Sequence, residues 1–386
     1  MPGLLPNVDP DGLLEYSVVY TDRALNHMSQ RFQRVMNDIS RTLKQVYQAE
    51  AAIVVPGSGT YAMEAVARQF ATGRHCMVIR NGWFSYRWSQ IFEMGSIPAE
   101  TTVLTAVRTQ ADPQAPFAPP PIGEVVAAIR EQKPDLVFAA HVETASGIML
   151  PQDYLRAVAD AVHEHGGMFV LDCIASGAIW VDMQAVGVDI LISAPQKGWS
   201  GPACAGLVML GEEARRRIDS TASTSFACDL RKWLQIMQSY EQGGFAYHAT
   251  MPTDSLLTLR DVMAEAESRG FENLRTAQQT LGDRVRSMLR EKGFRSVAAP
   301  GFEAPGVVVC YTDDDGIQSA KKFAAAGVQA AAGVPLQCGE PADFKTFRIG
   351  LFGLDKWADI DGTVNRLARA VDEIQSASEP AAAMGR

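Results

Sequence analysis

The sequence predicts an α/β fold, in which a mainly parallel sheet is covered by helices on both faces and is followed by a smaller C-terminal α+β domain. Short apolar runs alternate with glycine turns and helical patterns from about residue 51 to residue 210. Unbroken apolar strands separated by helices are typical of parallel sheets buried on both faces. The chain of 386 residues also exceeds what one hydrophobic core usually supports, which favours a second domain.

The first predicted strand spans residues 51–55 and is followed by Pro56-Gly57-Ser58-Gly59-Thr60 and a helix over residues 61–70. Compact apolar segments bounded by polar residues or glycine predict the next strands. These strands cover residues 76–79, 135–140, 168–171, 190–192 and 205–210. The proline-rich stretch 113–121 is expected to be an exposed connector inside this domain, because the alternation resumes directly after it.

From about residue 254 the pattern changes to longer helices, predicted over 256–269 and 273–292. A strand over 307–312, a helix over 317–326, a strand over 346–351 and a terminal helix over 356–376 follow. We therefore expect an N-terminal arm (1–25), a large domain (26–255), a small domain (256–376) and a tail (377–386). The tail is small and polar enough to be disordered.

The composition favours small soluble ligands. The chain has 35 basic and 44 acidic residues, a net charge of −9, which argues against a nucleic-acid surface and against a polybasic membrane patch. Its six cysteines show no paired or metal-ligand spacing, so we expect reduced packing residues and no metal site. Neither an export signal nor an 18-residue apolar stretch is apparent, which is typical of a cytoplasmic enzyme without a membrane partner.

Lys197 and Asp172 form the most informative pair in the sequence. Asp172 closes an apolar strand, and Lys197 follows in the run Ile192–Gly198. Pyridoxal phosphate (PLP) chemistry requires a lysine amine for the Schiff base with the cofactor aldehyde and a carboxylate that keeps the pyridine nitrogen protonated. Taken alone, such a lysine is usually a solvated surface group and such an aspartate a turn former.

Further candidates fall at the same edge of the predicted sheet, because ligands bind at the carboxyl ends of parallel strands. Ser58-Gly59-Thr60 opens a helix, where free backbone amides and the helix dipole suit an anion. An ordinary turn with an N-cap would explain the same residues.

Three more residues have a functional and a structural interpretation. In Asn81-Gly82-Trp83-Phe84-Ser85, one aromatic ring could stack on a pyridine ring, or both could pack at a subunit contact. Thr144, in His141–Gly147, could bond the ring's phenolic oxygen or belong to a simple turn. Arg348, flanked by apolar residues, could bind a substrate carboxylate through its planar fork or form a structural ion pair.

Together these segments resemble the class V aminotransferases of fold type I, most closely the branch of alanine–glyoxylate and serine–glyoxylate aminotransferases. The similarity runs from about residue 26 to 375, and its most specific part is the segment 170–176 leading to 188–197. The resemblance implies a PLP enzyme with a seven-stranded type of sheet in its large domain. It places Asp172 at the pyridine nitrogen and the cofactor on Lys197.

The resemblance also implies roles for the other candidates. Phosphate contacts fall on Ser58, Gly59, Thr60 and Gln196. The stacking aromatic falls on Phe84, the ring-oxygen hydroxyl on Thr144 and the substrate-carboxylate arginine on Arg348. Tyr247 and Thr250 match a family segment that reaches the phosphate of the neighbouring subunit, which implies a homodimer with shared active sites.

The implied activity is transfer of an amino group from a small amino acid, of the alanine or serine type, to a 2-oxo acid such as glyoxylate or pyruvate. Alternatives are an aminophosphonate donor, a lyase or desulfurase on the same fold with Cys338 as the candidate thiol, and a catalytically idle relative. The chain departs from the family's pattern at residues 14–20 and at Trp199, which bear on specificity. Asp254 is expected either to select a positively charged substrate or to cap the helix after it.

Overall fold

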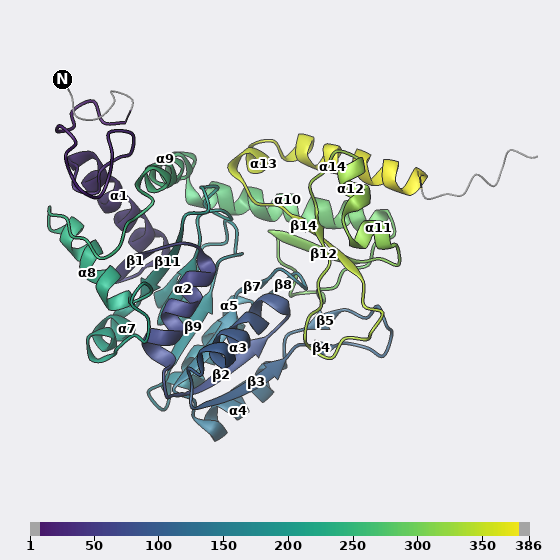
Figure 1. Ribbon diagram of the computed structural model, residues 1–386. Helices are drawn as coiled ribbons and strands as arrows, with labels where there is room; N and C mark the ends of the chain where they lie inside the picture. The colour runs from purple at the N-terminus through teal and green to yellow at the C-terminus, as the bar shows by residue number, and fades with distance from the viewer. Residues whose placement is uncertain (1–7, 378–386) are drawn as a thin grey trace, which may run out of the picture.

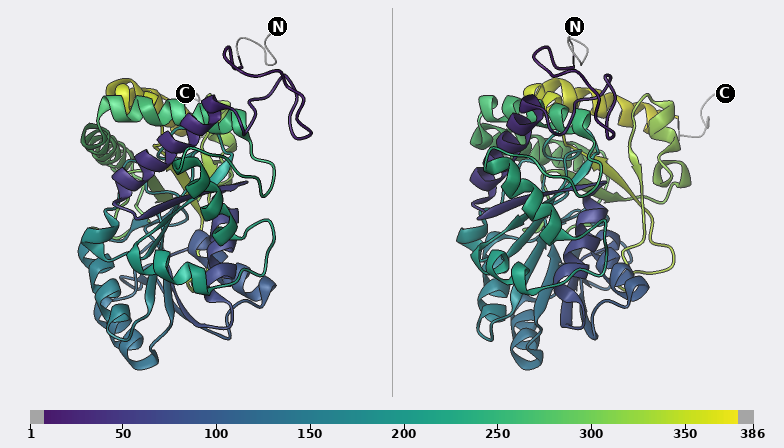
Figure 2. Two further views of the ribbon diagram at one scale, coloured as in Figure 1. Left: turned by 90° about the vertical axis from the view of Figure 1, so that its left-hand side faces the viewer. Right: turned by 60° about the vertical axis from the view of Figure 1, so that its left-hand side comes forward.

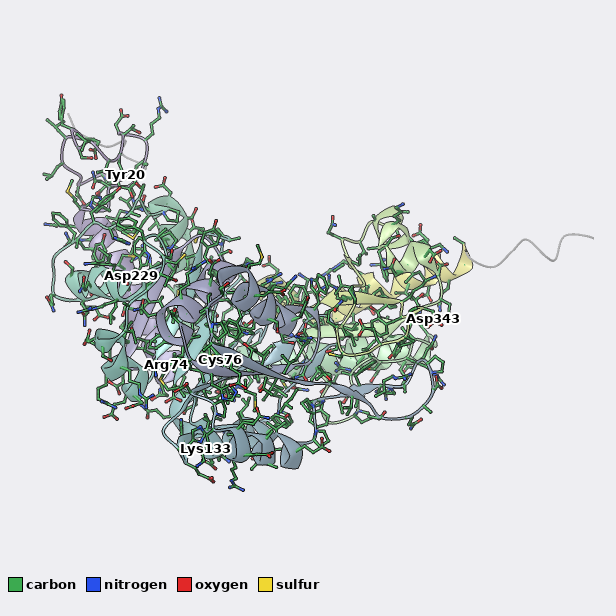
Figure 3. All side chains as sticks on the ribbon, turned by 60° about the horizontal axis from the view of Figure 1, so that its bottom comes forward. Tyr20, Arg74, Cys76, Lys133, Asp229 and Asp343 are labelled. Carbon is green, nitrogen blue, oxygen red and sulfur yellow. The ribbon has the colours of Figure 1, made fainter. Side chains whose placement is uncertain are left out.

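The computed structural model of the protein describes residues 8–377. The start of the expected N-terminal arm and all but the first residue of the expected tail lie outside the described residues. Two sheets dominate the fold, one built from residues 51–210 and one from residues 307–350 (Figure 1). The view of Figure 3 has Tyr20, in the N-terminal segment, and Asp343, which precedes the last strand, near opposite ends of the molecule.

The larger sheet has seven strands, and only one of them runs against the others. In sheet order they are β1 (Ala51–Pro56), β11 (Ala205–Leu210), β10 (Ile190–Ser193), β9 (Met168–Asp172), β6 (Leu136–Ala140), β2 (His75–Arg80) and β3 (Glu100–Thr105). Strand β11 pairs antiparallel with β1 and β10, and the remaining neighbours pair parallel. The predicted mainly parallel sheet is therefore confirmed.

Helices cover both faces of this sheet (Figure 2). The helices α2 (Gly59–Val66) and α3 (Trp83–Gly95) pack on β11 and on β2, respectively. The helix α5 (Gln152–His163) packs on β9 and β6, with α4 (Ile122–Gln132) and α6 (Met183–Val186) beside it. Side chains of the central strands β6, β9 and β10 are buried along their whole length, which explains why these segments are continuously apolar.

Three helices pack against β1 or β11 at one side of the sheet. Two long helices follow them in the chain and connect the large sheet to the smaller one. The first three are α1 (Gln30–Tyr47), α7 (Glu212–Arg217) and α8 (Leu230–Glu241). The helix α9 (Thr253–Arg269) packs on α1, and α10 (Phe271–Glu291) continues toward the smaller sheet. In the described part of the chain, no helix is long and apolar enough to cross a membrane.

The smaller sheet has three antiparallel strands in the order β12 (Val307–Tyr311), β14 (Thr346–Gly350) and β13 (Ala331–Ala332). The helices α10 and α14 (Ile360–Ser376) pack together beside it. The single helix predicted over 317–326 is wrong: it consists of α11 (Asp315–Gln318) and α12 (Lys321–Ala325), because Ala320 has a left-handed φ of 60°. The terminal helix is likewise divided, into α13 (Leu354–Ala358) and α14.

The proline-rich stretch is not an exposed connector. It contains β5 (Phe117–Ala118), which pairs with β4 (Val107–Arg108). The Phe117 side chain is 1% exposed, and its backbone N–H donates to the Val297 carbonyl at 2.7 Å. A segment of the first half of the chain thus packs against the part that carries the smaller sheet.

The N-terminal segment is tied to the residues before α9. The Tyr20 hydroxyl donates to the Met251 carbonyl at 2.9 Å, and the Leu25 N–H donates to Asp254 Oδ1 at 3.0 Å. Asp254, expected near the substrate entrance, therefore holds this segment in place.

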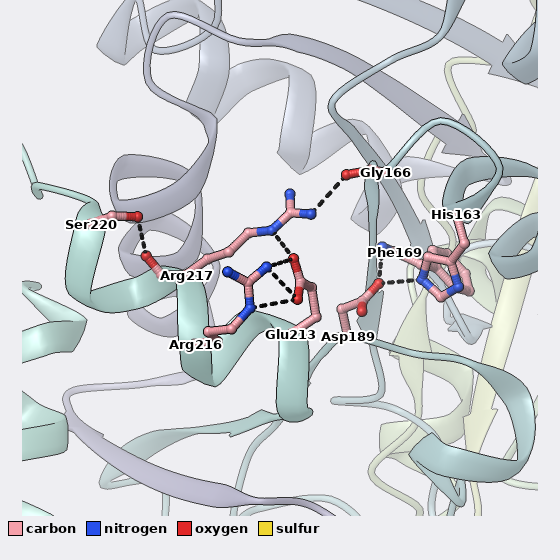
Figure 4. Close-up of polar contacts among 8 residues, drawn as sticks. All are labelled: His163, Gly166, Phe169, Asp189, Glu213, Arg216, Arg217 and Ser220. Carbon is pink, nitrogen blue, oxygen red and sulfur yellow. Dashed lines mark hydrogen bonds and ion pairs between the residues drawn. The ribbon is translucent and has the colours of Figure 1, made fainter.

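A network of polar side chains lies at the amino ends of the strands β9 and β10 (Figure 4). Asp189 Oδ2 accepts from His163 Nε2 at 2.8 Å and from the Phe169 N–H at 2.7 Å. Nearby, Arg217 pairs with Glu213 and donates to the Gly166 carbonyl at 2.8 Å. The hydrogen bond to Asp189 raises the pKa of His163.

We expect the stabilisation by His163 to depend on pH. Because its pKa is raised in the folded state, its contribution is fully present below the unfolded pKa of about 6.5 and is lost as the pH rises through the folded value. His163→Ala should therefore lower the free energy of unfolding more at about pH 5.5 than at about pH 8.5. The side chain is 39% exposed, so the pH-dependent part should be about 0.5 kcal/mol.

Urea unfolding of the PLP-free protein at both pH values measures this difference. Asp189→Asn keeps an acceptor for the Phe169 N–H but removes the charge. In that background, His163→Ala should have the same effect at both pH values, and a pH dependence that persists there would contradict the assignment.

Candidate active site

A cavity of about 170 Å³ opens at the carboxyl edge of the large sheet. It is lined by residues at or after the ends of β1, β6, β9 and β10 and by residues of the helices α2 and α3. They are Ser58, Gly59, Thr60, Met63, Phe84, Arg87, Val142, Thr144, Asp172, Ile174, Ala175, Gln196 and Lys197. Eight of the eleven candidates from the sequence thus meet in one place, and the exceptions are Tyr247, Thr250 and Arg348.

Asp172 lines the cavity from the end of β9. It ends β9 in the middle of the sheet, where its neighbours in register are Ala140 on β6 and Ile192 on β10. Its side chain is 7% exposed, and Oδ1 accepts from the Ile174 N–H at 2.8 Å. Burial raises the pKa of Asp172 to about 7, against the opposing effect of that hydrogen bond. A group with this pKa can hold or share a proton at neutral pH.

Lys197 lies on a tight turn after β10. The Ser200 N–H donates to the Lys197 carbonyl at 3.1 Å and closes the turn. A Cβ at Gly198 would approach the Gly177 carbonyl oxygen to 2.1 Å, so only glycine allows the two loops to touch. Burial, followed by the positive charge of Arg348, lowers the pKa of Lys197. A lowered pKa leaves more of the neutral amine, which is the nucleophilic form.

The start of α2 forms one wall of the cavity. A Cβ at Gly59 would lie 2.6 Å from Ile174 Cδ1, so glycine lets the first turn of α2 pack on the loop after β9. Ser58 and Thr60 flank this glycine, and Gln196 lies beside Lys197 among the lining residues. The free amides of a helix start, together with two hydroxyls, suit a phosphate group.

Phe84 is positioned by a residue that the sequence analysis did not single out. Glu143, in the short strand β7 (Val142–Glu143), is fully buried. Its carboxylate accepts from the backbone N–H groups of Phe84 at 3.2 Å and Ser85 at 2.8 Å, and from the Ser85 hydroxyl at 2.7 Å. It also accepts from the Ala145 N–H at 2.9 Å. One carboxylate therefore fixes the first turn of α3 next to Thr144.

Arg87 is a second site residue that the sequence analysis missed. It follows Phe84 by three positions on α3, and its Nη1 donates to Thr60 Oγ1 at 3.2 Å. Its guanidinium carbon lies 5.2 Å from the centroid of the Phe84 ring. The spacing of three on a helix places both residues on one face, and this spacing could have identified Arg87 once Phe84 was singled out.

Arg348 is on β14, the central strand of the smaller sheet. Its Nε donates to the Ala332 carbonyl at 2.8 Å, which leaves the terminal nitrogens for a ligand. Its guanidinium carbon lies 5.4 Å from the centroid of the Phe84 ring, and Lys197 Nζ lies 5.4 Å from the centroid of the Phe352 ring. The arginine is thus adjacent to the lined cavity without belonging to its wall.

Tyr247 and Thr250 lie outside the cavity, on the connection between α8 and α9. Their hydroxyls are 2.9 Å apart, and the Tyr247 side chain is exposed. The Tyr247 ring contacts the ring of His27 at a centroid distance of 5.5 Å. On this chain the two residues form a surface feature next to the N-terminal segment.

Trp199 and Trp83 do not line the cavity. Trp199 is fully buried, and its ring packs on Trp180 at a centroid distance of 4.6 Å. Trp83 packs on Tyr86 at 5.6 Å. Phe84 is therefore the aromatic side chain of Asn81–Ser85 that faces the cavity.

The residues present fit PLP. A buried acid suits the pyridine nitrogen, an aromatic ring suits the cofactor's face, an amine suits its aldehyde, and the start of α2 suits its phosphate. Within residues 8–377, no group of three or more His, Cys, Asp or Glu side chains is arranged to hold a metal ion.

Comparison with known proteins points to one family. The sequence profile of the family described as Aminotransferase class-V matches residues 12–344. An alanine–glyoxylate aminotransferase of Rattus norvegicus is 25% identical over 363 residues, which cover 91% of this chain and 82% of the relative. A 2-aminoethylphosphonate–pyruvate transaminase 2 of Polaromonas sp. is 27% identical over 350 residues, with 89% of each chain covered.

Solved structures support the same fold. The alanine–glyoxylate aminotransferase from Nostoc sp. superposes with a TM-score of 0.77 at 22% identity, covering 90% of this chain and 88% of the other. The ureidoglycine–glyoxylate aminotransferase from Bacillus subtilis gives a TM-score of 0.76 at 20% identity, with 93% and 89% covered. Fold type I is confirmed by these neighbours.

We expect Asp172→Asn to stabilise the PLP-free protein at high pH. The folded pKa of about 7 exceeds the unfolded value of about 3.9, so ionisation opposes folding as the pH rises through this window. The amide of the asparagine stays neutral, so the variant does not lose stability in this way as the pH rises. The gain should approach about 4 kcal/mol at about pH 8, because the folded value of about 7 already includes the effect of the nearby cations, and it should vanish near pH 4.

Urea unfolding across this pH range measures the effect. A difference between variant and wild type that stays constant with pH would contradict the raised pKa. The same variant should bind PLP more weakly, because an amide cannot hold the charge of a protonated pyridine.

Proposed function

Because the chain belongs to the class-V aminotransferase family, a family of PLP-dependent enzymes, we propose that it moves an amino group from a small amino acid to a 2-oxo acid. The observation that carries the proposal is that Lys197 and Asp172 meet in one cavity. The proposed donors are of the alanine or serine type, and the proposed acceptors are glyoxylate or pyruvate.

PLP, when bound, supplies an aldehyde and an electron-accepting ring. The roles that we propose for holding it follow from the geometry. Ser58, Gly59, Thr60 and Gln196 would bind its phosphate, Phe84 would stack on its ring, and Thr144 would donate to its ring oxygen. Asp172 would hold the proton at the pyridine nitrogen, a role that its burial supports.

Two basic side chains, those of Arg348 and Lys197, act on the donor in this proposal. Arg348 would bind the donor carboxylate through its terminal nitrogens, because its Nε is already held by the Ala332 carbonyl. Lys197 Nζ would then move a proton at the donor's α carbon, a general acid–base step for which a lowered pKa is suited.

A second candidate donor is an aminophosphonate. The similarity to a 2-aminoethylphosphonate–pyruvate transaminase over most of both chains favours it, and Arg348 suits a phosphonate as well as a carboxylate. A desulfurase is disfavoured, because burial raises the pKa of the Cys338 thiol to about 12. Its Sγ also donates to the Arg80 carbonyl at 3.4 Å, so the thiol is neither ionised nor free.

We also propose a homodimer in the cytoplasm. Tyr247 and Thr250 present two hydroxyls away from their own cavity, which supports a role at the phosphate of a second copy. All six cysteines are free, which supports a reducing compartment.

Lys197→Ala should abolish transamination. Loss of both the covalent attachment point and the general base should lower the rate at least about a thousandfold. The absorbance of bound PLP in the visible region should shift as well. Turnover with alanine, serine and 2-aminoethylphosphonate against glyoxylate and pyruvate measures the activity and ranks the two donor classes.

The matched control for this experiment is Lys321→Ala, which removes an exposed lysine on α12. Unchanged turnover in Lys197→Ala, or an equal loss in both variants, would refute the assignment.

A mixture of two inactive variants tests the shared site. Lys197→Ala and the double variant Tyr247→Phe, Thr250→Ala should each be impaired alone. After co-refolding, hybrid dimers would contain one site with a complete set of residues. Half of the dimers would be hybrids, so activity should recover to about a quarter of the wild-type value. No recovery, despite dimers in sedimentation experiments, would show that the hydroxyls act elsewhere.

A further inference from the structure

Arg87 has no role in the function proposed above, although it lines the same cavity as Lys197 and Asp172. Its Nη1 donates to the Thr60 hydroxyl at 3.2 Å, one residue into α2. Its guanidinium also lies against the Phe84 ring. Arg87 therefore connects the start of α2, where an anion would bind, with the aromatic platform on α3.

One of the two positively charged side chains that line the cavity has no function in the reaction proposed above. Among the described residues that line it, Arg87 and Lys197 carry the two positive charges. Lys197 is needed for the aldehyde of PLP, whereas a phosphate monoester at neutral pH carries a charge of about −1.5 to −2. The amides and hydroxyls at the start of α2 contribute partial charges alone. A phosphate bound there would therefore still need a full positive counter-charge beside the start of α2.

Arg87 is also short of an anionic partner within the protein. In the described part of the chain it forms no ion pair with a carboxylate, and its side chain contacts the Thr60 hydroxyl and the Phe84 ring. Of the two buried acids nearby, Glu143 is engaged with the first turn of α3. The charge of Arg87 lowers the pKa of the other, Asp172, but the two side chains form no ion pair. A half-buried guanidinium in this situation is ready to bind an anion from outside.

The local structure fixes the orientation of Arg87. Glu143 secures the first turn of α3 through the N–H groups of Phe84 and Ser85. Phe84 and Arg87 are three residues apart on that helix, so the ring and the guanidinium project from the same face. The platform for the cofactor ring and the cation for its phosphate would thus be positioned by one carboxylate.

We propose that Arg87 binds the phosphate group of PLP, together with Thr60, and so selects the phosphorylated cofactor over unphosphorylated pyridoxal. The inference rests on the proposed function, since it assigns a further residue to the same site. It makes Arg87 a cofactor-binding residue that leaves the donor to Arg348.

The test compares PLP with pyridoxal, which has the aldehyde and the ring but lacks the phosphate. Dissociation constants are measured on PLP-free protein by quenching of tryptophan fluorescence, for wild type, Arg87→Met and Arg87→Lys. Arg87→Met should weaken PLP binding by about 10- to 100-fold, the usual effect of losing a charge-assisted hydrogen bond to an ion. Its affinity for pyridoxal should stay within about threefold of wild type, and Arg87→Lys should retain part of the preference.

Inorganic phosphate gives a second measurement that is independent of the aldehyde. It should compete with PLP for wild-type protein and compete more weakly for Arg87→Met. The matched control is Arg80→Met, because Arg80 stacks on Tyr86 of the same helix at 4.6 Å but does not line the cavity.

The outcomes separate the two proposals. If Arg87→Met loses PLP and pyridoxal affinity equally, Arg87 is a structural support and the inference is wrong. If it binds PLP as well as wild type does, the phosphate is held by α2 alone and the inference is again wrong. If wild-type protein itself binds no PLP, the proposed function fails as well, and that result is distinguishable from the other two.

Discussion

The geometry of the site depends on the register of three parallel strands. Asp172 is level with Ala140 on β6 and with Ile192 on β10, so its carboxylate emerges at the centre of the sheet edge, where both faces are covered. Five residues after Ile192 the chain reaches Lys197, and the turn between them brings an amine toward the same point. Burying an acid and an amine together is tolerated because each moderates the charge of the other. A slip of one residue in β9 would turn Asp172 to the opposite face of the sheet.

A second constraint is the anchoring of α3. Glu143 accepts four hydrogen bonds, three of them from the first turn of that helix and one from Ala145. A buried carboxylate is stable only when its oxygens are satisfied in this way. The result is that β7 and α3, which are far apart in the sequence, form one rigid unit around Phe84. Arg87 and Thr144 belong to that unit, so several side chains of the cavity share one support.

Much of the large sheet and its site could be predicted from the sequence, since buried strands are apolar and their ends carry polar residues. The strand β3 was missed, because at the sheet edge its residues Glu100–Thr105 are only partly buried and read as polar. The division of the helix at Ala320 has no sequence signal, since alanine is a strong helix former. Phe117 was assigned to an exposed connector because the surrounding prolines outweighed one aromatic. Glu143 could not be identified because its contacts depend on neighbours that only the folded chain brings together, whereas the spacing of three from Phe84 could have identified Arg87.

The hydrogen bond between the turn that carries Lys197 and the segment that follows β14 bears on the size of the proposed donor. Ser200 Oγ accepts from the Leu354 N–H at 2.9 Å, and Leu354 follows the strand of Arg348 by only a few residues. The turn that carries Lys197 and the segment that follows the strand of Arg348 are therefore joined by a hydrogen bond. In the proposed function, this link would limit how far apart the Lys197 amine and the Arg348 guanidinium can lie, and with it the distance between the amino and acid groups of a donor.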